Sequence, residues 1–210
     1  MSEKPAGRLT NDERRESILE AATVVFGERG YHGATTDAIA SAAGISQAYV
    51  VRMFGSKEEL FIAAGRRAAD RVLDGFRAAI ATFTPTTTLE DRKLALAAAY
   101  SDLVVDRGLL LTLMHFYGLG HDPVLGPLGR ESYLRVFRVV RDEAGFPAEE
   151  ATAFFAKGML INVLVALRIP DVAETDDAAR DLLTCTMHGK EMELIALSAL
   201  QPRLAPGRRA

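Results

Sequence analysis

Apolar residues recur at the spacing of an α-helix along almost the whole chain. Ile18, Ala22 and Val25, for example, are separated by four and three residues, so they share one face of a helix. No convincing run alternates between apolar and polar residues, which is the pattern of a half-buried β-strand. The spacing therefore predicts an all-α protein.

Glycines and capping residues divide this pattern into separate helices. Thr10 and Glu13 form a capping box at the start of the first helix, and Gly30 ends that helix. Ser56 and Glu59 form a second capping box, which opens a long helix. The helices predicted after the first span 36–43, 46–55, 56–76, 89–106, 108–119, 128–144, 148–168 and 176–198. Gly and Pro content predicts a loop at 120–129, and the best linker candidate is 84–88.

The composition is that of a soluble globular protein. The chain has 210 residues, of which 49% are hydrophobic and 25% charged, and this suits one large or two small domains. Its single cysteine, Cys185, excludes an intrachain disulfide and fits a reducing cytosol. The polar N-terminus is no signal peptide, and the most apolar run, 154–167, is shorter than the ~20 residues that span a bilayer. We therefore expect a cytoplasmic protein with no membrane partner.

No constellation of catalytic residues or metal ligands is visible in the sequence. The four histidines are scattered, and His115 and His121 are six residues apart, which fits neither helical spacing that brings side chains together. Nucleophile motifs and phosphate-binding glycine loops are absent as well. We expect a protein that is not an enzyme, with no catalytic residues, no metal site and no cofactor. A helical enzyme acting on neutral apolar substrates is the enzymatic alternative.

The helix predicted at 46–55 is so short that it needs an anchor. At ~100° per residue, Val50, Val51 and Phe54 fall on one side, where they can pack on the first helix. The opposite side carries Ala48, Tyr49 and Arg52. With the helix before it and a turn at Gly44, this segment forms a helix-turn-helix candidate, whose second helix enters the major groove of DNA.

The residues on and around this short helix suit DNA recognition. Gln47, in its first turn, pairs well with adenine, and Arg52 can reach guanine or a phosphate. Tyr49 offers a ring to a thymine methyl and a hydroxyl to a phosphate. Lys57 and the amides that open the next helix form an anion site, and Thr36 plays a similar part at 36–43. The predicted DNA-binding residues are Thr36, Ser46, Gln47, Ala48, Tyr49, Arg52 and Lys57.

Residues 14–61 resemble the N-terminal DNA-binding domain of the TetR (tetracycline repressor) family of bacterial regulators. The matching features are Ala22, Phe26, Gly30, Thr36, Ile39, Ala40, Gly44, Phe54, Lys57 and Leu60. The resemblance implies a homodimeric transcription factor, usually a repressor, that a small molecule releases from DNA. The expected domains are a helix-turn-helix DNA-binding domain at 1–55, with a mobile arm at 1–9, and a helical effector-binding and dimerisation domain at 56–200, before a mobile tail at 201–210.

Two positions depart from the family pattern. Val51 stands where a Tyr is frequent, and Met53 where an aromatic residue or His is frequent; here the Tyr comes two positions earlier, at Tyr49. Residues 1–60 also hold seven Lys and Arg against nine Asp and Glu, a net charge of −2. A basic DNA-binding face must therefore come from the placement of individual cations, namely Arg8, Arg14, Arg15, Arg52 and Lys57.

An effector pocket is predicted beyond the DNA-binding domain. The segment 109–120 carries a flexible Met and aromatic residues that suit a mainly apolar ligand, which His115, Tyr117 or Asn162 could orient. The candidate lining residues are Met114, His115, Phe116, Tyr117, Phe137, Phe155, Met159 and Asn162. Ordinary core packing explains each of these residues equally well.

The helix predicted at 148–168 is apolar on nearly every face, so it must be buried on nearly every face. With the helix at 176–198 as its companion, it would form an isologous four-helix interface between two subunits. A buried central helix in a monomer is the alternative.

The sequence therefore predicts a dimeric, ligand-responsive regulator that binds a double-stranded DNA operator, with an unidentified small molecule as effector. The alternative is a helical small-molecule carrier or sensor that does not bind DNA. DNA binding through phosphates weakens steeply with salt, and this dependence separates the two.

Overall fold

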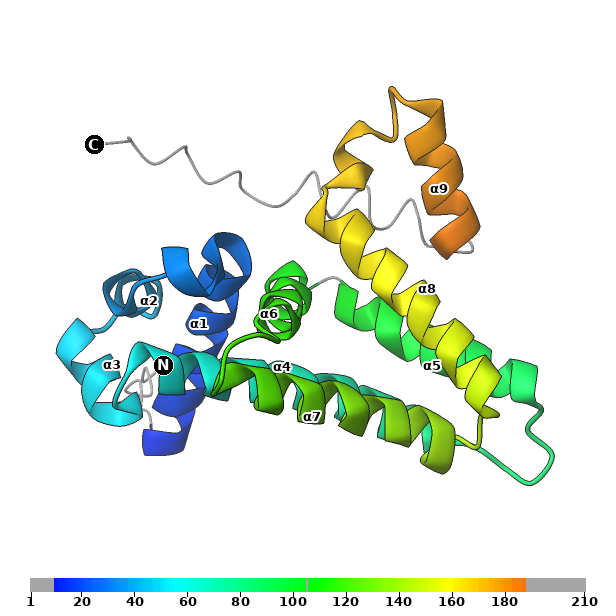
Figure 1. The fold of residues 1–210 in the computed structure, drawn as a ribbon, viewed down its shortest axis with the longest axis horizontal. Helices are drawn as coiled ribbons and strands as arrows, with labels where there is room; N and C mark the ends of the chain where they lie inside the picture. Colours follow the sequence, from blue (N-terminus) through cyan, green and yellow to red (C-terminus); the bar gives the residue numbers. More distant parts are fainter. Residues whose placement is uncertain (1–9, 105, 188–210) are drawn as a thin grey trace, which may run out of the picture. The chain divides into compact units, whose positions relative to one another are not determined.

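The computed structural model describes residues 10–104 and 106–187, and every regular element in these residues is a helix (Figure 1). The predicted all-α class is therefore confirmed. The helices are α1 (Asn11–Gly33), α2 (Thr36–Ala42), α3 (Gln47–Phe54), α4 (Lys57–Ile80), α5 (Leu89–Val104), α6 (Arg107–Gly118), α7 (Leu125–Arg138), the π-helical turn η1 (Val139–Glu143), α8 (Ala148–Ala166), the 3-10 turn η2 (Ile169–Val172) and α9 (Asp177–Met187). Within the described ranges, no helix combines the length and the apolar character that a membrane span requires.

Some predictions concern residues outside the described part of the chain. These are the arm at 1–9 with Arg8, the segment 188–198 of the last predicted helix, and the tail at 201–210.

The first helix begins and breaks at the residues that the sequence indicates. The Thr10 hydroxyl accepts from the Glu13 amide at 3.2 Å, and the Thr10 amide donates to the Glu13 carboxylate at 2.7 Å. This is the predicted capping box. Gly30 has a φ of 66° and a ψ of 176°, which breaks the helix there, although helical turns resume up to Gly33. Glycine adopts this positive φ without the strain that a Cβ would bring.

The start of α7 differs from the sequence prediction. α7 begins at Leu125, inside the segment 120–129 that was expected to be a loop. One carboxylate oxygen of Asp122 accepts hydrogen bonds from the amides of Val124 and Leu125, each at 2.8 Å. Asp122 thus supplies partners that amides at a helix start otherwise lack. Pro127 falls within the first turn, where a missing amide hydrogen costs no helical bond.

The described residues divide into two compact units. Unit 1 comprises 10–71 and 108–134, and unit 2 comprises 72–104, 106–107 and 135–187. Besides the three N-terminal helices, unit 1 therefore contains the first part of α4, α6 from Gly108 onward and most of α7. The boundaries of the two units differ from the predicted domain boundary at residue 55. The extent of the DNA-binding domain therefore stays a prediction.

The core of unit 1 contains a row of aromatic rings that joins α1, α4 and α6. The ring centroid of Phe61 lies 4.8 Å from that of Phe26 and 5.6 Å from that of Phe116, and all three rings are fully buried. α1 and α6 also approach closely at Gly27 and Gly108: a Cβ on Gly27 would lie 2.7 Å from the Gly108 carbonyl oxygen. This packing explains why α6 belongs to unit 1.

In unit 2, α5 and α8 lie side by side, and α9 packs against α8 and η2 (Figure 1). The ring centroid of Phe76 lies 5.9 Å from that of Phe154 and 6.2 Å from that of Tyr100. Arg77 donates to both carboxylate oxygens of Glu143, from Nε at 3.0 Å and from Nη2 at 2.9 Å. The aromatic core and this bidentate pair fix the C-terminal end of α4 within unit 2.

Candidate nucleic-acid interface

α3 is an eight-residue helix whose two ends are set by local signals. The Ser46 hydroxyl accepts from the amide of Tyr49 at 3.3 Å, as expected of an N-cap. Gly44 and Gly55 have φ values of 67° and 81°, so the chain turns sharply before and after the helix. The turns and the cap together fix where α3 begins and ends and how the chain turns between α2 and α3.

The buried side of α3 is narrower than the helical arithmetic predicts. Val50 and Phe54 are buried in the core of unit 1, whereas Val51 is 43% exposed. Val51 is rotated about 100° from Val50, beyond the stripe that the core covers. The prediction that Val51 packs inward is therefore wrong. Val51 joins the exposed side of the helix, which also carries Gln47, Ala48 and Arg52.

The side chains of Gln47 and Thr36 are joined across the turn. Gln47 Nε2 donates to the Thr36 hydroxyl oxygen at 2.9 Å. Thr36 is the first residue of α2, and the N-cap is Thr35, whose hydroxyl accepts from the Ala38 amide at 3.1 Å. The sequence pattern indicated a role for Thr36, and the role of Thr35 was not predicted. The adjacent threonines are the signal that could have found it, because Thr is frequent at N-caps.

Tyr49 is half-buried, and two arginines lie over its ring. The guanidinium carbon of Arg52 is 4.7 Å from the ring centroid, and that of Arg14, from α1, is 5.8 Å away. A third arginine, Arg15, lies 4.5 Å from the ring centroid of Phe54. All three distances are within the ~6 Å of a cation–π contact. Cations of α1 and α3 are thus gathered around two rings of α3, although the net charge of this region is negative.

Lys57 is half-buried at the start of α4. Its Nζ donates to the carbonyl oxygen of Ala34 at 3.3 Å and lies 4.7 Å from the ring centroid of Tyr31. Burial, together with the negative charges of Glu58 and Asp122, raises the pKa of Tyr31. An ammonium group has three hydrogens, so Lys57 can hold the chain after α1 and also donate to an anion.

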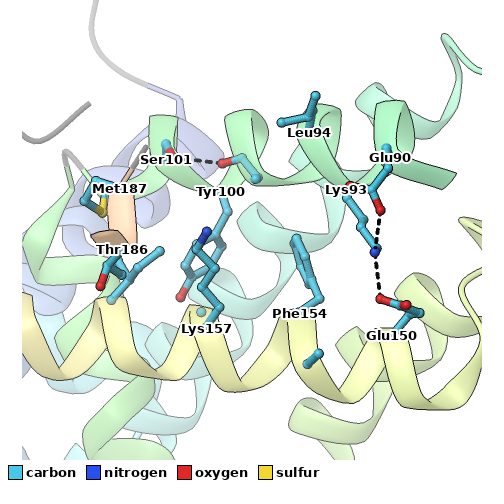
Figure 2. A pocket seen from close by; sticks show the side chains of 14 residues that line it. Glu90, Lys93, Leu94, Tyr100, Ser101, Glu150, Phe154, Lys157, Thr186 and Met187 are labelled. Atoms are coloured by element: carbon cyan, nitrogen blue, oxygen red, sulfur yellow. Dashed lines mark hydrogen bonds and ion pairs between the residues drawn. The ribbon is translucent and has the colours of Figure 1, made fainter. Parts of the chain in front are cut away.

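Unit 2 contains a cavity of about 390 Å³ between α5, α8 and the end of α9 (Figure 2). A cavity of this size suits a small-molecule ligand. Lys93 Nζ contacts Glu150 and Glu90 at one end of it, each at 2.7 Å, and these two hydrogen bonds raise the pKa of Lys93. The remaining lining is mainly apolar and includes Leu94, Ala97, Tyr100, Phe154, Ile161 and Met187.

None of the predicted effector residues lines this cavity. Four of them, Met114, His115, Phe116 and Tyr117, lie on α6 in unit 1. Phe116 is fully buried, so core packing describes it, and a ring nitrogen of His115 lies 3.2 Å from the Gly27 carbonyl oxygen. Tyr117 packs edge-to-face on Tyr133 and borders a separate hollow of about 310 Å³ within unit 1.

The other four predicted effector residues lie in unit 2. Phe137 and Phe155 pack on each other, with ring centroids 5.2 Å apart. Asn162 is buried; its Oδ1 accepts from the Tyr100 hydroxyl at 2.6 Å, and its Nδ2 lies 3.8 Å from the sulfur of Met159. Asn162 thus supports a wall of the cavity through Tyr100 without lining it.

The residues that do line the cavity were missed from the sequence. They form two rows at helical spacing: Lys93, Ala97 and Tyr100 on α5, and Glu150, Phe154, Lys157 and Ile161 on α8. Figure 2 shows Tyr100 and Phe154 projecting from the two helices into the space between them. The spacing within each row could have shown that its residues share one face of a helix. The sequence pattern does not show that α5 packs beside α8, which is what makes the two rows face each other.

Comparison with known proteins supports the interpretation of α2 and α3. The family model for bacterial regulatory proteins of the tetR family matches residues 18–64. The chain is similar to the HTH-type transcriptional activator FasR of Mycolicibacterium smegmatis, with 40% identity over 107 residues that make up 48% of each protein. It is also similar to the HTH-type transcriptional repressor AcnR of Corynebacterium glutamicum, with 39% identity over 74 residues, which are 35% of this chain and 38% of that protein. The aligned part thus spans about half of the first relative and less of the second. Both relatives are named as transcriptional regulators, in agreement with the expectation of a protein that is not an enzyme.

The fold is similar to that of a TetR-like transcriptional regulator from Rhodococcus sp. RHA1. The match has a TM-score of 0.60 at 23% identity and covers 91% of this chain and 97% of that one. The family match spans most of α1, then α2, α3 and the start of α4, and it includes the exposed surface described above. The fold similarity extends over most of the chain. Residues 18–64 thus match the tetR family of bacterial regulatory proteins, and the fold of most of the chain is similar to that of a TetR-like regulator.

Proposed function

We propose that this chain is a homodimeric transcriptional repressor that binds a double-stranded DNA operator through α3 and releases it when a small molecule occupies unit 2. The observation that carries the proposal is α3 itself. It is capped, anchored by Val50 and Phe54, and exposes Gln47, Ala48 and Arg52 within the segment that matches the family. A helix held and exposed in this way fits the major groove of DNA.

Gln47 is the proposed base contact. After its bond to Thr36, Nε2 keeps one hydrogen to donate, and Oε1 is an acceptor. These two groups match N7 and the N6 amino group of adenine. Ala48 would meet a thymine methyl, and Arg52 a guanine or a phosphate. Thr36, Ser46 and Lys57 would contact phosphates and fix the helix in the groove, and Tyr49 completes the surface.

The homodimer is proposed from the exposed apolar face of α8. Leu160, Val163 and Leu167 recur at helical spacing and are 39%, 39% and 66% exposed. On α9, which packs against α8, Leu182 is a further exposed apolar residue. The same face on a second copy would cover these residues in an isologous interface, formed by the two C-terminal helices of each subunit.

The effector is proposed to be a mainly apolar small molecule in the cavity of unit 2. The volume and the aromatic and aliphatic lining suit such a ligand. Ligand binding releases DNA only if the ligand binds the DNA-free conformation more tightly. FasR is named an activator and AcnR a repressor, so similarity to them supports regulation in either direction. A regulator of this kind would act in the bacterial cytoplasm.

Selection of duplexes from a random pool by the purified protein tests the proposal. Isotherms on selected and scrambled duplexes, measured at several salt concentrations, should show steep weakening with salt. Gln47→Ala should cost about 1–3 kcal/mol on the selected duplex and relax base preference at one position. A protein that enriches no duplex at low salt would instead be the carrier or sensor that does not bind DNA.

A further inference from the structure

We infer that Tyr49 is a positioning residue for Arg14 and Arg52, and that the Arg14 contact extends the DNA-binding surface from α3 onto α1. The inference rests on the proposed function and deepens it. It gives Tyr49 a role other than reading a base, and it adds Arg14 to the residues that meet the phosphate backbone.

The position of the Tyr49 ring is set by packing. Tyr49 is half-buried and packs against the core of unit 1. Over this ring lie the guanidinium groups of Arg52 and Arg14, at 4.7 and 5.8 Å from its centroid. An arginine side chain loses considerable rotamer freedom when it is immobilised. A fixed ring beneath the guanidinium reduces that loss before DNA arrives, which is the basis of preorganised binding.

The same geometry argues against a base contact by the ring. A thymine methyl packs on an aromatic face, but a guanidinium group already lies over the face of the Tyr49 ring. The guanidinium group therefore competes with a thymine methyl for the ring, and the Tyr49 hydroxyl presents no bidentate pattern that would distinguish base pairs. The guanidinium groups, by contrast, can each form paired hydrogen bonds to a phosphate.

Two carboxylates near Arg14 on α1 accept hydrogen bonds from other residues. The Glu13 carboxylate accepts from the Thr10 amide at 2.7 Å. The Glu16 carboxylate accepts from Arg67 Nε at 2.6 Å. Arg14, Arg15 and Arg52 lie around the rings of Tyr49 and Phe54, although residues 1–60 carry a net charge of −2. Such local placement of cations is what DNA binding by this segment requires.

The experiment compares variants of the full-length chain on the selected operator and on a scrambled duplex over a range of salt concentrations. Tyr49→Leu removes the ring. It should lower the affinity for both duplexes by about fivefold, which is the loss expected from one or two exposed cation–π contacts. Tyr49→Phe keeps the ring and should restore most of the lost affinity. Arg14→Gln should lower the affinity for both duplexes. It should also reduce the slope of log affinity against log salt concentration by about one unit. Arg66→Gln, which removes an exposed arginine of α4, is the charge-matched control and should leave affinity unchanged.

A double-mutant cycle measures the coupling between Tyr49 and Arg14 in DNA binding. A role of Tyr49 in folding alone would give no such coupling. If Tyr49 positions Arg14, then Arg14→Gln should cost less in the Tyr49→Leu background than in the wild-type chain. Additive losses overturn the inference, as does Tyr49→Phe if it binds as weakly as Tyr49→Leu. A Tyr49→Leu variant that changes base preference but not affinity for the scrambled duplex would show that the ring reads a base.

Folding is monitored by thermal melts of each variant. If Tyr49→Leu has a lower melting temperature than the wild-type chain, the test rests on Arg14→Gln, which leaves the ring in place. If Arg14→Gln binds DNA with wild-type affinity, Arg14 does not contact DNA and the inference is overturned. If the wild-type chain binds no duplex at all, the proposed function fails and this inference falls with it. Wild-type binding without the predicted coupling overturns the inference alone.

Discussion

The hydroxyl of Thr112 donates a hydrogen bond to the carbonyl oxygen of Thr23 at 2.8 Å, and this bond joins α6 to α1 inside unit 1. Both residues are buried, and the Thr23 hydroxyl in turn donates to the carbonyl oxygen of Leu19 at 2.7 Å. One turn further along each helix, His115 contacts the carbonyl oxygen of Gly27. Two side chains of α6 thus hold consecutive turns of α1 through its carbonyl groups.

Replacing Thr112 should therefore destabilise unit 1. Thr112→Val keeps the shape of the side chain but removes the buried donor, and we expect the free energy of unfolding to fall by about 1–2 kcal/mol. Thr152→Val is the control, because the Thr152 hydroxyl bonds the Ala148 carbonyl of its own helix at an exposed position. It should change stability by less than about 0.5 kcal/mol. Urea unfolding curves measure both, and equal effects would contradict the assignment.

Asp122 should stabilise the start of α7 in a pH-dependent manner. Hydrogen bonds from the amides of Leu125 and Val124 hold the pKa of this carboxyl below its usual range. Because the folded state has the lower pKa, the stabilisation is present above the unfolded pKa of about 4 and is lost as the pH falls through the folded value. At about pH 7, the wild-type chain should therefore have a higher melting temperature than Asp122→Asn. This difference in melting temperature should shrink towards about pH 3.

Asp122→Asn is the informative comparison because it keeps an uncharged acceptor at the same place. Melting temperatures from circular dichroism across this range provide the measurement. A gap between the two proteins that stays constant as the pH falls would show that ionisation of Asp122 does not contribute.

The exposed face of α8 should control association. We expect the wild-type chain to sediment at micromolar concentration as a species of about twice 22.8 kDa. Leu167→Glu places a charge on the proposed interface and should give the mass of one subunit, since burying an unpaired charge is costly. Leu94→Glu on α5 is matched in exposure, because Leu94 and Leu167 are both 66% exposed, and it should leave the dimer intact. A wild-type monomer, or a Leu167→Glu dimer, would contradict the proposed interface.

Filling the cavity of unit 2 should abolish effector binding without affecting the DNA surface. Ala97→Phe introduces a ring between α5 and α8, and native mass spectrometry should then show loss of any small molecule that co-purifies with the wild-type chain. Ala98→Phe, at the exposed neighbouring position, should retain that molecule. Both variants should bind the operator like the ligand-free wild-type chain. Retention of the ligand by Ala97→Phe would place the effector elsewhere.

The helical class and most helix ends follow from local signals in the sequence. Thr10 and Ser46 cap the helices they were predicted to cap, and Gly30 and Gly55 have the positive φ values of chain turns. These features follow from the sequence because capping and turn formation act within a few residues along the chain. The exposed side of α3 depends also on packing, because Val50 and Phe54 are buried in the core of unit 1 whereas Val51 is exposed.

Which side chains line a cavity and which fill a core depends on how the helices pack against one another. Phe116 and Phe154 are the same residue type on apolar helices, yet Phe116 is buried against Phe61 while Phe154 borders the cavity of unit 2. The difference depends on which helix packs opposite each ring, and those partners lie tens of residues away along the chain. Periodicity reports the face of a helix that is apolar, but it carries no information about what that face will meet.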